Sequence, residues 1–247
     1  MNKKSKASLA TSKKPSNVLR SSSDPKRAIL IGPAIQKQDR TFLKKKLLQL
    51  RIQKSDWLLG VDGGAQFWLE LGVVPNYAVG DWDSLSPRSF KRLKDTPKET
   101  LSQDKLRSDL HYAIQSASRV GVSELICLGV TGGRPDHHLA SLYELANASR
   151  QSPLRSVTAF GPEGDYHFFS DFMPQPLRLS LKKATLLSIL PVLEEAQGLS
   201  LSGFRYPMNN GLLSFSSHGL SNVVSKTPCE IQLRSGCVVV MIPTEQK

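Results

Sequence analysis

The sequence has few cysteines and no long hydrophobic run. Its three cysteines, Cys127, Cys229 and Cys237, are scattered among 247 residues and match neither a disulfide framework nor a zinc site. No apolar run reaches the roughly 18–20 residues that a membrane-spanning helix needs. We therefore expect a protein of a reducing compartment, the cytoplasm, that does not associate with a membrane.

Acidic residues are scarce at the amino terminus. The chain has a net charge of +12, and more than half of this excess lies in residues 1–27, where Asp24 is the only acid. Large apolar residues are also rare there, so this segment cannot bury enough surface to offset the entropy lost on ordering. We expect residues 1–26 to form a disordered basic leader. The alternative is a transit peptide, which also lacks acids, although Arg20 is the only arginine before Lys26.

Several familiar nucleotide-binding motifs are missing. The sequence contains no Walker A motif, no G-x-G-x-x-G and no kinase-type H-R-D. Beyond the leader it also has no basic stripe interleaved with aromatic residues, so nucleic acid is not an expected partner. Any phosphoryl chemistry must therefore be built from another template.

Strand-like and helix-like segments alternate in residues 27–172. Apolar runs such as "AILIG", "DWLLGV" and "ELICLGV" predict buried strands, and amphipathic segments between them predict helices. Ser86-Pro87 and Ser108 have the residue types of helix starts. This alternation predicts an α/β N-terminal domain with a mainly parallel sheet covered by helices on both faces.

The pattern of strand-like and helix-like segments changes after about Phe172. Short strand-like runs separated by Gly, Pro and Asn predict an all-β C-terminal sandwich domain at residues 173–247. "RSG", residues 234–236, lies between "EIQL" and "CVVVMI" and predicts a hairpin turn. No segment of this region has the pattern of a helix.

Acidic and glycine-rich segments follow three of the predicted strands. Asp62, Asp81 and Gly132 each come just after a strand, and ligands of parallel sheets bind at the carboxyl ends of strands. In an extended segment Asp81 and Asp83 would point the same way, with Trp82 turned into the protein, and two carboxylates suit magnesium. The alternative is an ordinary turn, because Asp and Ser favour turns.

The stretch "TGGRPDHH" opens a second glycine-rich turn before a helix. Glycines there let backbone amides approach an anion, and the planar fork of Arg134 suits phosphate. The alternative for Arg134 is a surface salt bridge. The alternative for His137, and more so for His138, is a hydrogen-bonded structural histidine.

Four segments in order resemble the thiamine pyrophosphokinase family. They are "VDGGAQFWLELGVVPNYAVGDWDSLSP", "SDLHYAI", "GVTGGRPDHHLASLYEL" and "GFRYPMNNGLLSFSSHGLSN". The resemblance implies an α/β catalytic domain, a C-terminal β-sandwich that binds thiamine, and a homodimer with a composite active site. It also implies transfer of the pyrophosphoryl group of ATP to the hydroxyl of thiamine, with Mg2+ as cofactor and AMP as product.

The resemblance also assigns roles to individual residues. Asp62, Asp81, Asp83 and Asp109 would be catalytic, with Asp81 and Asp83 holding the metal and Asp109 as candidate general base. The implied ATP-binding set is Gly63, Gly64, Ser84, Gly132, Gly133, Arg134, Asp136 and His137, and the implied thiamine-binding pair is Ser221 and Asn222. "SQDKLRSD" departs from the family pattern by two extra residues, which leaves Gln103, Asp104 and Lys105 uncertainly aligned.

Two rival functions remain open at this point. One is a pyrophosphokinase for another small alcohol, such as a hydroxymethylpterin. The other is a nucleotide-binding regulatory protein without turnover, although simple binding would not require so many acids around an anion.

Overall fold

The computed structural model describes residues 25–83, 85–102 and 104–244. Ser84 and Gln103 therefore lie outside the described residues, as does almost all of the expected basic leader. No helix in these ranges is long and apolar enough to cross a membrane.

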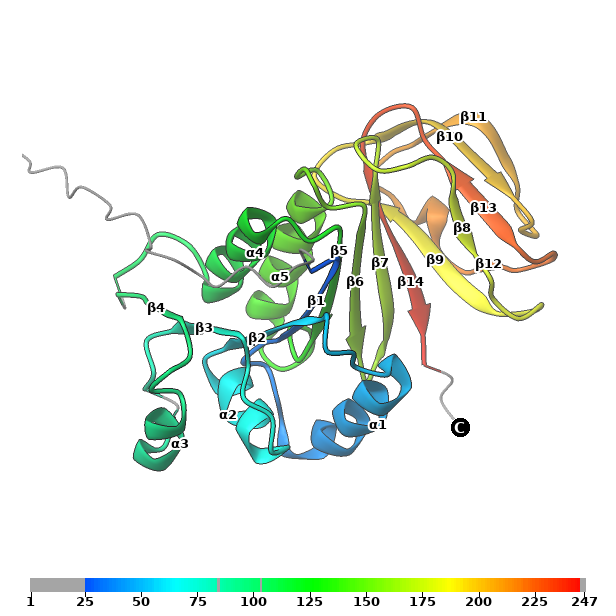
Figure 1. Ribbon diagram of the computed structural model, residues 1–247. Helices are drawn as coiled ribbons and strands as arrows, with labels where there is room; N and C mark the ends of the chain where they lie inside the picture. Colours follow the sequence, from blue (N-terminus) through cyan, green and yellow to red (C-terminus); the bar gives the residue numbers. More distant parts are fainter. Residues whose placement is uncertain (1–24, 84, 103, 245–247) are drawn as a thin grey trace, which may run out of the picture.

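A ten-stranded sheet runs through the whole molecule (Figure 1). Its order is β12-β9-β14-β7-β6-β5-β1-β2-β3-β4, and the half from β6 to β4 is parallel, whereas the half from β6 to β12 is antiparallel. The predicted parallel sheet is thus confirmed for the amino-terminal part. The strands are β1 (Arg27–Ile31), β2 (Trp57–Val61), β3 (Tyr77–Gly80), β4 (Lys98–Thr100), β5 (Glu124–Leu128), β6 (Ser156–Gly161), β7 (Gly164–Ser170), β9 (Leu186–Pro191), β12 (Asn222–Val223) and β14 (Cys237–Pro243).

A second, four-stranded antiparallel sheet has the order β11-β10-β13-β8. Its inward side chains belong to the same hydrophobic core cluster as those of β9 and β14, so the two sheets share one core. The boundary that we expected after residue 172 falls between β7 and β8. The large sheet continues across it. The strands of the second sheet are β8 (Leu177–Leu179), β10 (Ala196–Ser202), β11 (Met208–Leu213) and β13 (Cys229–Gln232).

The hairpin predicted at residues 234–236 is wrong. β13 belongs to the four-stranded sheet, whereas β14 pairs with β7 and β9 in the large sheet. The backbone N–H groups of Arg234 and Ser235 donate to the carbonyl oxygen of Gln197 instead. The turn therefore carries the chain from one sheet to the other.

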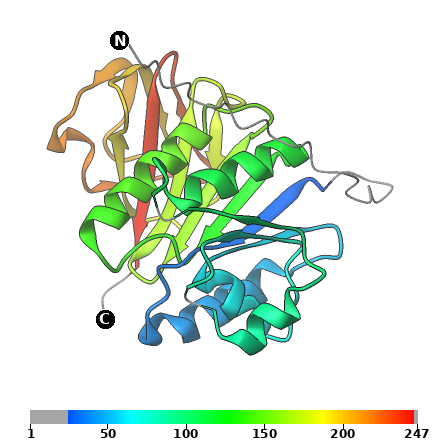
Figure 2. The same ribbon diagram turned by 90° about the vertical axis from the view of Figure 1, so that its left-hand side faces the viewer.

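Helices cover both faces of the parallel half of the large sheet. In β1, Ala28 and Leu30 pack in the core cluster that includes α4 and α5, whereas Ile29 and Ile31 pack in the cluster that includes α1 and α2. Figure 2 shows α4 and α5, in green, lying across one face. The helices are α1 (Arg40–Leu50), α2 (Gly63–Glu70), α3 (Pro87–Arg92), α4 (Asp109–Val120) and α5 (Pro135–Ala148), with short 3-10 turns η1 (Lys37–Asp39) and η2 (Ser217–Gly219).

Two predicted helix caps are confirmed. The side chain of Ser86 accepts the N–H of Ser89 at the start of α3, and that of Ser108 accepts the N–H of His111 at the start of α4. Ser108 thereby fixes the point at which the chain enters α4, and Asp109 becomes the first residue of that helix.

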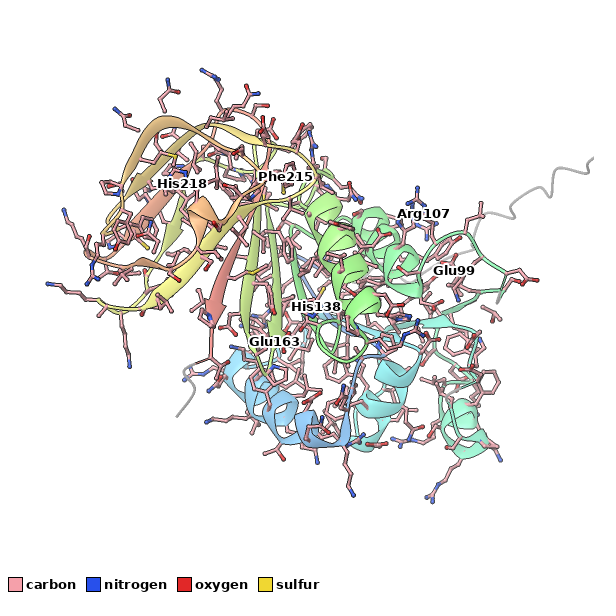
Figure 3. All side chains as sticks on the ribbon, turned by 180° about the vertical axis from the view of Figure 1, so that it is seen from behind. Glu99, Arg107, His138, Glu163, Phe215 and His218 are labelled. Carbon is pink, nitrogen blue, oxygen red and sulfur yellow. The ribbon has the colours of Figure 1, made fainter. Side chains whose placement is uncertain are left out.

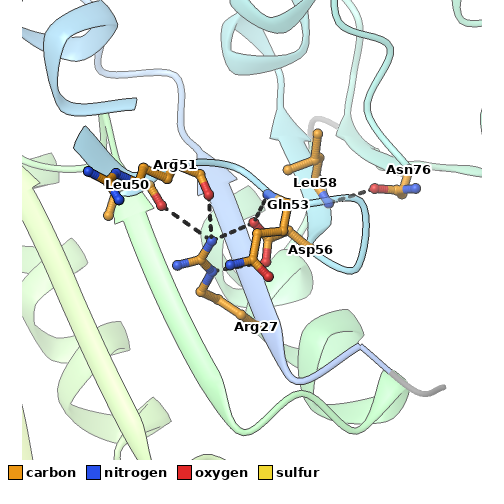
Figure 4. Close-up of polar contacts among 7 residues, drawn as sticks. All are labelled: Arg27, Leu50, Arg51, Gln53, Asp56, Leu58 and Asn76. Atoms are coloured by element: carbon orange, nitrogen blue, oxygen red, sulfur yellow. Dashed lines mark hydrogen bonds and ion pairs between the residues drawn. The ribbon is translucent and has the colours of Figure 1, made fainter. Parts of the chain in front are cut away.

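The start of β1 is tied to the loop that leads into β2 (Figure 4). The guanidinium of Arg27 donates two hydrogen bonds to the carboxylate of Asp56, at 2.9 and 2.6 Å, and also contacts the carbonyl oxygens of Leu50 and Arg51. A cation at the carboxyl end of α1 satisfies carbonyl groups that the helix leaves unpaired. These bonds fix α1 and β2 against β1.

Candidate active site

The strand order reverses between β1 and β5. Successive strands are added on one side of β1 as β2, β3 and β4, and on the other side as β5 and β6. In open parallel sheets ligands bind outside the carboxyl ends of strands at such a reversal. The loops after β1 and β5 meet there, where the N–H of Ala34 donates to the carbonyl oxygen of Gly129 at 2.8 Å.

Three of the predicted catalytic carboxylates come together beside this point. Asp62 follows β2, Asp81 follows β3, and Asp109 opens α4. The carboxyl groups of Asp62 and Asp109 lie close enough to interact electrostatically, and Oδ1 of Asp62 accepts the N–H of Asp81 at 3.2 Å. Gly80 permits this approach, because a β-carbon there would collide with Oδ1 of Asp62.

Asp62 is held in an unfavourable environment. Its backbone has φ 45° and ψ −117°, a conformation that non-glycine residues rarely adopt. Burial, together with the charges of Asp109 and Asp81, raises its pKa to about 7. Burial and the two neighbouring carboxylates together disfavour the ionised form of Asp62.

We expect Asp62→Asn to stabilise the metal-free protein at pH 8. A carboxyl with a raised pKa loses its stabilising contribution as the pH rises from about 4 through 7, and asparagine does not ionise. The gain in the free energy of unfolding should be about 1–2 kcal/mol, since solvent screens part of the repulsion. Urea unfolding at pH 8 and pH 4.5 checks this. A gain that was the same at both pH values would contradict the charge explanation.

The segment from Asp81 to Asp83 is a tight turn and not an extended strand. Trp82 has a φ of 68°, and the N–H of Asp83 donates to Oδ1 of Asp81 at 3.2 Å. The expectation that residues 81 and 83 point the same way because they are extended is therefore wrong. Trp82 does turn inward, packing beside Leu85 and donating its indole N–H to Thr100.

The carboxylates suit a divalent cation in chemistry and in charge. They are hard oxygen ligands, and a cation would favour the ionised form of Asp62, whose pKa is raised first by burial and then by its carboxylate neighbours. In the described ranges no group of three or more His, Cys, Asp or Glu side chains is already arranged to hold a metal ion.

The glycine-rich turn follows β5, the strand on the other side of the reversal point. Gly132 and Gly133 have φ values of 80° and 69°, which glycine adopts without strain. The guanidinium of Arg134 is exposed and donates two hydrogen bonds to Asp136, at 3.1 and 2.6 Å. This is the surface salt bridge considered as the alternative, and it lowers the pKa of Asp136 to about 2. His137 is exposed.

At the start of α2 the two predicted glycines differ. A β-carbon at Gly64 would strike the carbonyl oxygen of Ile31, so glycine is required for close packing of α2 on β1, whereas Gly63 has open space around its α-carbon. The amide of Gly63 lies beside Asp62, at the first turn of the helix.

Two side chains near the glycine-rich turn, Glu163 and Thr131, were not singled out from the sequence. His138 accepts the N–H of Gly132 through Nδ1 at 2.8 Å and lies 3.9 Å from Glu163 in the β6–β7 turn (Figure 3). Thr131 is buried, and its hydroxyl has no hydrogen-bond partner among the described residues. The bond to Gly132 gives His138 the structural role that the sequence favours for it.

The predicted thiamine-binding residues lie in a different part of the molecule. A pocket of about 420 Å³ opens between β9, β10, β11 and β12, and His218 at its rim is visible in Figure 3, apart from His138 and Glu163. No acidic residue is among the described residues that line it. They are Ile189, Leu199, Leu201, Tyr206, Pro207, Met208, Leu213, His218, Gly219, Leu220, Ser221 and Asn222.

The side chain of Asn222 is buried and is hydrogen-bonded to backbone atoms beside the pocket. Its Oδ1 accepts the N–H groups of Tyr206 and Val223 at 3.1 and 2.8 Å, and its Nδ2 donates to the carbonyl oxygen of Tyr206 at 2.9 Å. Ser221 is exposed and has a φ of 57°. Asn222 therefore shapes the pocket by holding the backbone of Tyr206.

Replacing Asn222 by alanine should destabilise the protein by about 2–3 kcal/mol, because three part-buried hydrogen bonds to the backbone of Tyr206 and Val223 are lost. Urea unfolding measures the change. Ser221→Ala, at the exposed neighbour, is the matched control and should stay within about 0.5 kcal/mol of the parent. Equal stability of the two variants would show that Asn222 has no such structural role.

Comparison with known proteins gives consistent matches. The family model "Thiamin pyrophosphokinase, catalytic domain" matches residues 48–156, and "Thiamin pyrophosphokinase, vitamin B1 binding domain" matches residues 176–238. The matched segments together span well over half of the chain. The thiamine pyrophosphokinase of Bacillus subtilis (strain 168) is 28% identical over 167 residues, which cover 64% of this chain and 73% of that protein.

Solved structures share the fold. A crystal structure of thiamine pyrophosphokinase from Bacillus subtilis aligns with a TM-score of 0.71 at 22% identity, covering 89% of this chain and 100% of that one. Thiamin pyrophosphokinase from Candida albicans aligns with a TM-score of 0.66 at 16% identity, covering 88% of this chain and 90% of that one. The two-sheet architecture is therefore the one that these proteins have.

Proposed function

Because this chain belongs to the thiamin pyrophosphokinase family, we propose that it transfers the pyrophosphoryl group of ATP to the hydroxyl of thiamine, giving thiamine diphosphate and AMP. The observation that carries the proposal is the meeting of Asp62, Asp81 and Asp109 beside the point where the strand order reverses. An ATP phosphate chain there would lie between these carboxylates and the glycine-rich turn after β5.

Asp81 and Asp83 would hold magnesium, with Asp62 beside them, and the bound ion would neutralise charge on the phosphate oxygens. Arg134 lies at the start of α5, a helix of 14 residues whose first N–H groups face an approaching anion. Its bond to Asp136 is exposed to solvent, so a phosphate can compete for the guanidinium. We assign ATP contacts to Gly63, Gly64, Ser84, Gly132, Gly133, Arg134, Asp136 and His137.

The chemical step needs a proton acceptor. The thiamine oxygen attacks the β-phosphorus, the bond between that phosphorus and the oxygen bridging to the α-phosphorus breaks, and AMP leaves. Asp109 accepts the hydroxyl proton in this proposal, since it is a carboxylate at the start of α4 that lies beside Asp62 in the cluster. Holding both reactants in line supplies most of the acceleration.

The thiamine site would be shared between two subunits. The pocket at Ser221 and Asn222 has no acidic lining residue among those described, so thiamine bound there requires carboxylates from elsewhere. Large apolar side chains are exposed around it, including Tyr206, Phe215 and Leu220. A second copy of the chain that covers this surface would bring its own aspartates to the pocket. We therefore propose a homodimer.

The decisive experiment is incubation of the purified protein with ATP, magnesium and thiamine, followed by chromatography. Equal amounts of AMP and thiamine diphosphate support the proposal. Thiamine monophosphate with ADP would indicate a simple kinase, and no reaction with thiamine but turnover of a hydroxymethylpterin would indicate the rival substrate. The three buried free thiols, Cys127, Cys229 and Cys237, favour a reducing compartment, and we propose the cytoplasm.

A further inference from the structure

A lysine lies among the carboxylates of the candidate active site. Nζ of Lys105 is 2.7 Å from Oδ1 of Asp109, and both side chains are largely buried, with 15% and 19% of their surfaces exposed. The negative charges of Asp62 and Asp81 also act on this ammonium. Lys105 thus faces the three acids of the cluster.

Its position is not explained by the helix that follows. Lys105 pairs with the first residue of α4, at the helix end whose dipole disfavours a cation. The attraction of the carboxylates must therefore outweigh the dipole and the cost of burying the ammonium. A lysine that stabilised only α4 would be better placed at the carboxyl end of the helix, where the dipole favours a cation.

The loop that supplies Lys105 is otherwise turned outward. Its neighbours Asp104, Leu106 and Arg107 are exposed, Leu106 with 97% of its surface. Figure 3 shows Arg107 pointing away from the body of the protein. The same loop contains the two extra residues of "SQDKLRSD", so the inward lysine coincides with the departure of this chain from the family pattern.

We propose that Lys105 is the resident counter-cation of this cluster and competes with a divalent metal ion for its carboxylates. The inference rests on the proposed metal site. In the nucleotide-free protein the ammonium neutralises part of the charge that a metal would otherwise neutralise. A bare metal ion at Asp81 and Asp83 must overcome the repulsion of this ammonium, whereas a metal–nucleotide complex adds phosphate contacts that offset the repulsion. Lys105 thereby makes the enzyme select the complex over the free ion.

The test is binding of Mn2+ alone to the nucleotide-free protein, measured by the loss of the free-ion electron paramagnetic resonance signal. We expect Lys105→Gln to bind Mn2+ at least about 10-fold more tightly than the parent, because a charge a few ångströms from the ion is removed. Arg107→Gln removes the same charge from the same loop and should leave the affinity within about 2-fold. Lys105→Arg keeps the cation and should also bind Mn2+ weakly.

A second readout does not depend on manganese. The melting temperature of metal-free Lys105→Gln at pH 8 should be lower than that of the parent, and added Mg2+ should raise it by more than it raises the parent. Unchanged Mn2+ affinity in Lys105→Gln, or an equal gain in Arg107→Gln, would overturn the proposal. Neither measurement uses thiamine or turnover, so either result is separable from failure of the proposed enzyme activity.

Discussion

Asp81→Asn should abolish turnover and leave the fold intact. Asparagine keeps an oxygen that accepts the N–H of Asp83 at the same place, so the turn after β3 is preserved. It removes the charge through which we propose Asp81 holds magnesium, and with it the neutralisation of the phosphates during transfer. Turnover should fall by at least about 10³-fold, as expected when a principal electrostatic contact of a transition state is lost.

Steady-state production of AMP measures this loss, and circular dichroism and melting temperature check the fold. Asp95→Asn is the matched control, because Asp95 is an exposed aspartate that pairs only with Lys94 among the described residues, and its activity should not change. If Asp81→Asn kept near-normal turnover with the same magnesium dependence, the metal role of Asp81 would be refuted.

Two inactive variants should restore each other when mixed. Met208→Trp places an indole in the pocket from a half-buried position, so thiamine can no longer enter. Asp81→Asn leaves the pocket open but lacks the carboxylate. In a mixed dimer one composite site has both halves intact, and random exchange should restore about a quarter of the parent activity.

Each variant alone must be inactive in the same assay, and subunit exchange must be demonstrated with differently tagged chains. Met208→Leu preserves the volume of the pocket and is the control for folding. Asn222 is unsuitable for this experiment, since its side chain holds the backbone of Tyr206 and its loss affects stability as well as binding. Demonstrated exchange without recovered activity would reject the shared site.

Sequence patterns correctly predicted the features that depend on residues close together in the chain. The buried runs at Ile29 and Leu125 form parallel strands, and Ser86 and Ser108 cap helices, because these features depend on residues within one turn or one strand. The meeting of Asp62 and Asp81 followed from the rule that neighbouring parallel strands end at one edge. The roles that the family resemblance gives to these residues remain predictions.

Other features depend on contacts between segments far apart in the sequence. A Ser-Gly turn suits a hairpin and a passage between sheets equally well, and here the distant carbonyl oxygen of Gln197 takes the turn's N–H groups. The inward direction of Lys105 is set by carboxylates that approach from β2, β3 and α4 together. The spacing of residues along the chain does not reveal the combined electrostatic field of these carboxylates.

The unbroken large sheet has a mechanical consequence. β6, β7 and β14 are joined by continuous ladders, so the parallel half and the antiparallel half form one stiff plate with no hinge between them. Within a subunit, the aspartates and the pocket therefore cannot swing toward each other to enclose substrate. If the protein functions as we propose, water must be excluded by loop movement or by the second subunit of the proposed homodimer. If the second subunit closes the site, specific activity should decrease on dilution as dimers dissociate, and substrate binding should hold the dimer together.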